Sequence, residues 1–324
     1  MANKLIKYIR KPKLNNPYLV AAWPGMGNVA IRAVEFMLQH LKAKELAEIA
    51  PEGFFYPHEA WVLNSQIKRP CAPKGKFYFW QNPTKGKNDL IIFLCEAQPA
   101  LEKGYNYAQL VLDLADTFGV KRIFTFASMP MPIDHAQVSR VWATVTDKRL
   151  IRELSKFDVK PMRVGQISGL NGLLLSVAKE RRFEGLCLLA EIPLYAIQIE
   201  NPKASKAILT IFSQITGLVF NFSGLEERAK IVEDEIEKLV HYFKSGAAPA
   251  PINEEDVESI RQSLASVTKL PESAKTKIEE LFKMAERDLS RAGELKEELD
   301  KWHSYKDYED RFLDLFRPGR KDNN

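Results

Sequence analysis

The chain has 324 residues, of which 45% are apolar and 27% charged, a composition typical of soluble globular proteins with a large buried core. Three cysteines are too few for a disulfide framework, and no apolar run approaches the length of a membrane-spanning helix. The net charge is +5 and the basic residues are scattered, so we expect no nucleic-acid partner. Because the first residues also form no apolar signal core, we expect no membrane association and a cytoplasmic location.

The charge is unevenly divided along the chain. Residues 1–225 carry a net charge of +11, whereas residues 226–324 carry −6. Charges of opposite sign favour contact between the two parts, within one chain or between copies. Two solvated surfaces of unrelated composition would explain the difference equally well.

Short apolar runs alternate with helical patterns through residue 225, which is typical of a sheet covered by helices on both faces. The predicted strands are residues 18–23, 61–67 leading into a hairpin-like 76–81, 90–96, 122–127, 138–144 and 185–191. The predicted helices are residues 29–41, 107–118, 148–156, 170–180 and 203–216. We therefore expect an α/β domain over residues 1–225.

The first strand leads into the first helix through a glycine-bearing turn, Trp-Pro-Gly-Met-Gly-Asn at residues 23–28. Gly25, Gly27 and Ala30 have the G-x-G-x-x-A spacing of a dinucleotide-binding loop. That site also needs a second strand ending in an acid about 20 residues on. The only candidate for that second strand, the segment 44–49, is short, poorly apolar and followed by Pro51. We therefore interpret residues 23–28 as a tight turn between a strand and a helix, and we expect no cofactor.

Polar residues follow several predicted strands, and a second glycine-rich segment at residues 165–172 opens another helix. Because the loops at strand carboxyl ends form the ligand crevice of open α/β sheets, these residues could meet at one edge. Helix-entry amides there would attract an anion such as phosphate, with a glutamate as acid or base. Each residue alone is more often a helix cap or turn residue. The candidate ligand-binding residues are Gly25, Gly27, Asn28, Glu96, Ser128, Gly169, Asn171 and Glu191.

From residue 226 to 324 the pattern predicts long amphipathic helices, joined by a linker at residues 245–251. One helix is expected to begin at residues 253–256 and to continue through Val267. Its neighbours carry apolar stripes, the last of them aromatic, so we expect them to pack on their own domain or on a sister subunit. The stripe residues are Ile231, Ile236, Leu239, Val240, Phe243, Ile278, Leu281, Phe282, Ala285, Leu289, Trp302, Tyr305, Tyr308, Phe312, Leu315 and Phe316.

Four stretches stand out in order and spacing: residues 23–28, residues 88–92 with Gln98 and Pro99, residues 167–174, and residues 188–195 followed by 201–205. Together they resemble the proteasome assembly chaperone type 2 (PAC2) family over about residues 5–225. Two positions depart from the family pattern: Asn201 stands where Asp is frequent before proline, and Ala190 where glycine is frequent.

The resemblance implies a three-layer αβα sandwich with a mixed central sheet, similar to purine nucleoside phosphorylases and related hydrolases. Family members are mostly described as chaperone-like or uncharacterised, and some carry an ATP-grasp-like label. Relatives that engage the proteasome dock through a terminal hydrophobic-Tyr-any-residue tail. This sequence ends Lys-Asp-Asn-Asn, so we expect no docking through such a tail.

Two functions remain open. The first is a homo-oligomeric scaffold or assembly chaperone that could bind a protein partner, with a trimer slightly favoured over a dimer. The family resemblance supports it, as does the lack of a recognisable catalytic set, since none of the five histidines has triad-like or metal-like spacing. The second is a small-molecule enzyme or sensor that uses the anion-binding crevice. We expect no catalytic and no metal-binding residues under the first interpretation, which we prefer.

Overall fold

The computed structural model describes residues 5–56, 61–63, 66–68, 72–245, 272–301 and 305–316. By internal contacts the chain divides into two compact units, Met1–Ala250 and Pro251–Asn324. Helix α6 (Ser223–Ser245) packs against α5 (Pro202–Thr216), which places it in the first unit. The sequence-based boundary at residue 225 precedes most of this helix.

The described part of the first unit is built on a nine-stranded mixed sheet in the order β1-β3-β6-β7-β2-β8-β11-β9-β10. Strands β2, β7, β8 and β11 run parallel, and β1, β3 and β6 pair with their neighbours antiparallel. Strand β9 is antiparallel to β11 and parallel to β10. The bounds are β1 Ile6–Tyr8, β2 Tyr18–Ala22, β3 Lys44–Ile49, β6 Gly75–Trp80, β7 Leu90–Cys95, β8 Arg122–Met131, β9 Val141–Val145, β10 Lys160–Pro161 and β11 Glu184–Pro193.

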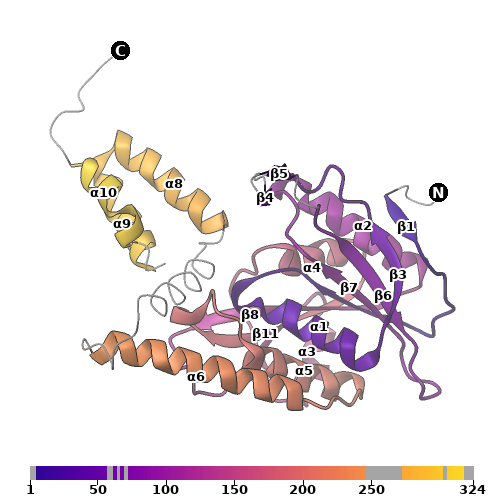
Figure 1. The fold of residues 1–324 in the computed structure, drawn as a ribbon. Helices are drawn as coiled ribbons and strands as arrows, with labels where there is room; N and C mark the ends of the chain where they lie inside the picture. The colour runs from indigo at the N-terminus through magenta and orange to yellow at the C-terminus, as the bar shows by residue number, and fades with distance from the viewer. Residues whose placement is uncertain are drawn as a thin grey trace. The chain divides into compact units, whose positions relative to one another are not determined.

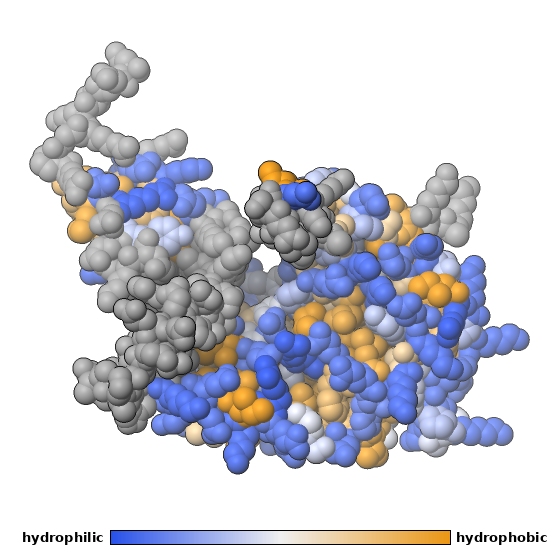
Figure 2. Space-filling model, viewed as in Figure 1, coloured by the Kyte–Doolittle hydropathy of each residue, from blue (hydrophilic) through white to orange (hydrophobic). Residues whose placement is uncertain are grey.

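Helices cover both faces of this sheet, so the predicted three-layer αβα fold is confirmed (Figure 1). Helices α2 (Gly104–Thr117) and α4 (Leu170–Glu180) pack on one face, and α1 (Val29–Leu41) and α5 on the other. The central strands are apolar on both sides because both sides are buried. On the face of the molecule drawn in Figure 2, hydrophobic residues of this unit lie scattered among hydrophilic ones.

Several elements differ from the sequence prediction. In place of one strand at residues 61–67, the structure has two short strands, β4 (Trp61–Leu63) and β5 (Gln66–Lys68), which pair with each other antiparallel. Strand β9 begins at Val141, because Val138 lies in an exposed loop. Strands β1, β3 and β10 have no counterpart in the prediction.

The described part of the second unit consists of α8 (Glu272–Arg287), α9 (Ala292–Lys301) and α10 (Tyr305–Asp314), with a single 3₁₀ turn before α9. The predicted stripe of α8 meets Phe312, Tyr308 and Leu315 in a small core, whereas Leu289 and Phe316 are exposed. Trp302 lies outside the described residues. In the predicted stripe of α6, Ile236 is buried but Ile231 is exposed. The helix predicted near residues 253–267 lies outside the described residues. No helix among the described residues is long and apolar enough to cross a membrane. The core residues are Ile278, Leu281, Phe282, Ala285, Ala292, Leu295, Leu299 and Phe312.

Candidate functional site

The turn between β2 and α1 lies at the carboxyl edge of the parallel strands. Residues Met26–Asn28 form a single 3₁₀ turn in which Gly27 has a φ of 63° and Asn28 a φ of 47°. A Cβ atom at residue 27 would lie 3.4 Å from the Asn201 side chain and 3.4 Å from the Ile192 side chain. Glycine is therefore required at position 27 both by the left-handed backbone and by close packing.

Asn171 of α4 holds the start of this turn. Its side chain is 4% exposed and accepts a hydrogen bond from the Trp23 backbone N–H at 3.0 Å. The same amide donates to the Trp23 carbonyl at 3.1 Å. The Asn171 side chain thus takes the place of a strand partner just where β2 ends, and it satisfies two backbone groups that would otherwise be buried without partners.

Gln98, in the loop after β7, joins the same turn to the entry of α4. Its side-chain N–H donates to the Pro24 carbonyl at 2.7 Å, and its side-chain oxygen accepts from the Leu170 backbone N–H at 3.0 Å. Gly169 precedes α4 with a φ of 73°, and a Cβ there would approach the Gln98 side-chain nitrogen to 3.0 Å. The Gln98 side chain can therefore occupy this position only because residue 169 is glycine.

The segment after β11 completes the arrangement from the opposite side. The Gly27 N–H donates to the Ile197 carbonyl at 2.7 Å, and the Asn201 N–H donates to the Gly27 carbonyl at 2.8 Å. The Ser128 hydroxyl, on β8, donates to the Met26 carbonyl at 2.8 Å. We call the turn at residues 23–28, with Gln98, Ser128, Gly169, Asn171, Ile197 and Asn201, the motif hub.

Six of the eight residues predicted from the sequence meet in the motif hub. Its backbone amides largely serve the fold: the Gly27 N–H is bonded to Ile197, and the Asn28 N–H donates to the Gly25 carbonyl at 2.9 Å. Two of the expected anion-binding donors thus have internal partners, while anion binding at the hub stays a prediction. The six residues are Gly25, Gly27, Asn28, Ser128, Gly169 and Asn171.

The two predicted glutamates hydrogen-bond to groups outside the motif hub. Glu96 is exposed and its carboxylate accepts from the Lys74 backbone N–H at 3.0 Å, beside the pairing of β6 with β7. Glu191 is 3% exposed and accepts from the Trp142 indole N–H at 2.8 Å. By strand alternation Glu191 shares the α2/α4 face with Leu189, whereas Ser128 shares the α1/α5 face with Phe126.

A second polar cluster, which the sequence did not reveal, surrounds His135. The His135 ring lies between the Tyr195 hydroxyl, 2.9 Å from Nδ1, and the Glu237 carboxylate of α6, 2.9 Å from Nε2. Lys203 donates to the His135 carbonyl at 2.7 Å and also pairs with Glu233 of α6. These residues are far apart in sequence, so no spacing could indicate the cluster. Its contacts attach α6 to the carboxyl edge.

Cys95, Cys187 and the potential metal ligands in the described part of the chain give no further candidate. Burial raises the pKa of Cys187 to about 12 and also raises the pKa of Cys95, so both thiols stay protonated in the core. Among the residues that the structure describes, no group of three or more His, Cys, Asp or Glu side chains could hold a metal ion.

Comparisons with known proteins agree with the fold. The model of the PAC2 family matches residues 19–240. The crystal structure of PbaB, an archaeal proteasome activator from Pyrococcus furiosus, is 30% identical with a TM-score of 0.63, covering 72% of this chain and 97% of PbaB. PbaA of the same organism, a homolog of proteasome-assembly chaperone, is 19% identical with a TM-score of 0.56, covering 74% and 99%.

A curated relative extends the comparison by sequence alone. An uncharacterized protein of Methanocaldococcus jannaschii is 28% identical over 256 residues, which cover 76% of this chain and 93% of that protein. The family match spans every residue of the motif hub.

Proposed function

This chain belongs to the PAC2 family, and we propose that it acts as a chaperone-like scaffold that binds the proteasome core particle or its subunits. The observation that carries the proposal is the similarity to an archaeal proteasome activator, which extends over 97% of that protein at 30% identity. Function is not implied by fold alone. The proposal therefore rests on sequence identity over nearly the whole activator as well as on shape.

The carboxyl edge of the sheet is the face that we propose for partner binding. Two loops there present large apolar side chains to solvent, Leu101 after β7 and Val138 before β9, which are 87% and 82% exposed. The motif hub holds the loops between these positions in fixed places through hydrogen bonds. Exposed apolar side chains on a rigid frame favour recognition of another protein surface.

Binding to purified core-particle α subunits from the same organism tests this proposal. Leu101→Asp and Val138→Asp should each weaken binding measured by biolayer interferometry, because a charge enters the contact. Val219→Asp is the matched control, since Val219 is 85% exposed and follows α5 at the opposite edge of the sheet. Equal binding by all three variants would contradict the proposed binding face. A lack of binding by the unmodified chain would contradict the proposed function.

We also propose that the chain forms a homo-oligomer, with a trimer favoured over a dimer. The opposite net charges of its two parts support contact between copies. Mass photometry at nanomolar to micromolar concentration should give a mass that is a multiple of 37.0 kDa. A monomer across that whole range contradicts the proposal.

Docking is proposed not to use the last residues of the chain, which lie outside the described part. Deleting residues 322–324 should leave binding to the core particle unchanged. A loss of binding after this deletion would show that the chain docks through its end.

A further inference from the structure

One end of the first unit gathers basic residues that are scattered in the sequence. Residues 5–16, 42–49 and 74–90 contain ten Lys and Arg residues but three Asp and Glu residues, which gives these segments a net charge of +7. That is more than half of the net charge of +11 on residues 1–225. We call the three segments together the basic end.

The three segments lie side by side in the fold. Strand β1 pairs with β3, and β3 pairs with β6 (Figure 1). The Gln81 side chain donates to the Lys13 carbonyl at 3.1 Å, and the Asn15 side chain donates to the Lys87 carbonyl at 3.0 Å. The segment that follows β1 therefore lies against the turn between β6 and β7, and their positive charges add to one field.

The three acidic residues of the basic end leave most of this charge uncompensated. Asp89 is 5% exposed, and its carboxylate accepts from two backbone N–H groups at 2.6 and 2.8 Å. Glu45 pairs with Lys76 at 2.6 Å, and this hydrogen bond lowers the pKa of Glu45 and raises that of Lys76. Glu48 lies opposite Lys7 on one side and Lys76 on the other.

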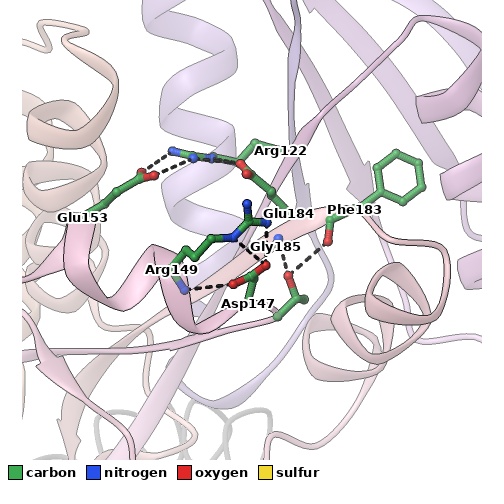
Figure 3. A network of polar contacts seen from close by, with 8 residues as sticks. Arg122, Asp147, Arg149, Glu153, Phe183, Glu184 and Gly185 are labelled. Atoms are coloured by element: carbon green, nitrogen blue, oxygen red, sulfur yellow. Dashed lines mark hydrogen bonds and ion pairs between the residues drawn. The ribbon is translucent and has the colours of Figure 1, made fainter.

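Figure 3 shows the opposite arrangement, in which cations are paired with acids. On β8 the Arg122 guanidinium donates to two glutamates at 2.8 and 2.9 Å. Asp147 caps α3 (Lys148–Leu154) and accepts from the Arg149 guanidinium at 2.7 Å. In the basic end, by contrast, six exposed cations form no ion pair with any residue that the structure describes. These cations are Lys7, Arg10, Lys11, Lys13, Lys85 and Lys87.

Strand β1 also offers backbone hydrogen-bonding groups, because it is the last strand at its end of the described sheet. The Leu5 carbonyl and the Ile9 N–H bond to the backbone of the β3 side, both at 2.8 Å. Alternate residues of an antiparallel strand bond to the same neighbour, so Ile6 and Tyr8 direct their N–H and C=O groups away from β3. Such an edge can take up a further strand.

We propose that the basic end binds an extended acidic segment of a partner protein, which adds as a strand to the open edge of β1. The segment alternates acidic and apolar residues, because β1 itself alternates. Lys7 is exposed, whereas Ile6 and Tyr8 pack with the core on the α2/α4 face. Acidic side chains of the added strand would meet Lys7 and, further along, Arg10 and Lys11. Its apolar side chains would continue the core face.

Two other occupants fit this surface less well. Strand β1 of a second copy carries the same cations and would be repelled. A nucleic acid has no backbone N–H groups that could continue the sheet. The surface is also separate from the carboxyl-edge face proposed above, because β3, β6 and β7 lie between β1 and the strand that leads into the motif hub.

Fluorescence anisotropy with the full-length chain and a labelled peptide tests the proposal. The peptide has eight residues that alternate glutamate with valine, and it is roughly 26 Å long when extended. Glutamine in place of each glutamate removes the charge, and proline in place of each valine keeps the charge but removes N–H donors. Each change should weaken binding at least about tenfold. No binding of the glutamate–valine peptide at millimolar concentration overturns the proposal, as does equal binding of the proline peptide.

Two variants with the same change in charge locate the binding. Neutralising three cations of the basic end should weaken binding of the glutamate–valine peptide at least about tenfold. Neutralising three exposed lysines outside the basic end should change it less than about twofold. Equal affinity of the two variants would overturn the assignment. The first variant combines Arg10→Gln, Lys11→Gln and Lys13→Gln, and the control combines Lys121→Gln, Lys156→Gln and Lys179→Gln.

The same variants separate the other occupants from the proposed one. The mass of the unmodified chain in mass photometry should equal that of the variant neutralised in the basic end; a smaller mass of this variant would show that a second copy occupies the surface and would overturn the proposal. An oligothymidylate with as many negative charges as the peptide should bind more weakly than the peptide. Tighter binding of the oligonucleotide would likewise overturn it.

Discussion

Replacing Asn171 with leucine removes both hydrogen bonds that this side chain makes to the Trp23 backbone. Leucine has similar length but no polar atom, so the Trp23 N–H and C=O would be left buried without partners. Each buried unsatisfied group costs about 1–3 kcal/mol, so the variant should lose roughly 2–6 kcal/mol of unfolding free energy. In a unit of this size the expected decrease in Tm is roughly 5–15 °C.

Urea unfolding followed by tryptophan fluorescence measures this loss. Four of the five tryptophans, Trp23, Trp61, Trp80 and Trp142, belong to the first unit, so the signal reports mainly on it. Asn106→Leu is the control, because Asn106 lies exposed in the first turns of α2, and its effect should stay within about 0.5 kcal/mol. A loss below about 1 kcal/mol for Asn171→Leu would refute the view that the motif hub stabilises the fold.

Three further predictions concern the motif hub, α6 and α3. Gly27→Val should lower Tm by several degrees more than Gly86→Val, because both glycines have positive φ but only at Gly27 would a side chain meet neighbours; equal decreases measured by scanning calorimetry would contradict this. His135→Ala should speed tryptic cleavage of α6 severalfold, since it removes the ring that links Tyr195 to this helix; an unchanged cleavage rate would show that other contacts hold α6. Hydrogen bonds from Arg149 lower the pKa of Asp147 to about 2, below its unfolded value near 4, so Asp147 stabilises α3 above about pH 4 and loses this effect as the pH falls toward 2. Amide hydrogen exchange in α3 should therefore rise in that pH window, measured relative to α4, and Asp147→Asn should remove the pH dependence.

The sequence predicts the central strands well, because strands buried on both faces are continuous apolar runs, as in Leu90–Cys95. It fails for Lys44–Ile49, a strand near the sheet edge that contains three charged residues and has an irregular register between Glu45 and Ala47, so neither a continuous apolar run nor a strict alternation marks it. Strands β1 and β10 are too short to produce a pattern. Their existence depends on the neighbouring strand that each one pairs with.

The proximity of Gly27, Gly169 and Asn171 could be expected, because each follows or faces the carboxyl end of a parallel strand. The hydrogen bond from the Gly27 N–H to the Ile197 carbonyl could not be predicted from the sequence. Every residue has a backbone carbonyl, and only the tertiary packing determines which one accepts this bond. The same limit applies to Glu191. Its position on the strand determines its face of the sheet, and that face is opposite to the face of Ser128.

Native mass spectrometry of core-particle assembly tests the proposed chaperone-like role most directly. The full-length chain is mixed with α and β subunits from the same organism, and the assembly species and peptidase activity are followed over time. We expect a transient or stable complex that contains the chain together with α subunits, and a changed rate of core-particle formation. With the chain at tenfold molar excess over the subunits, an unchanged rate of assembly and no species that contains the chain would contradict the proposed role.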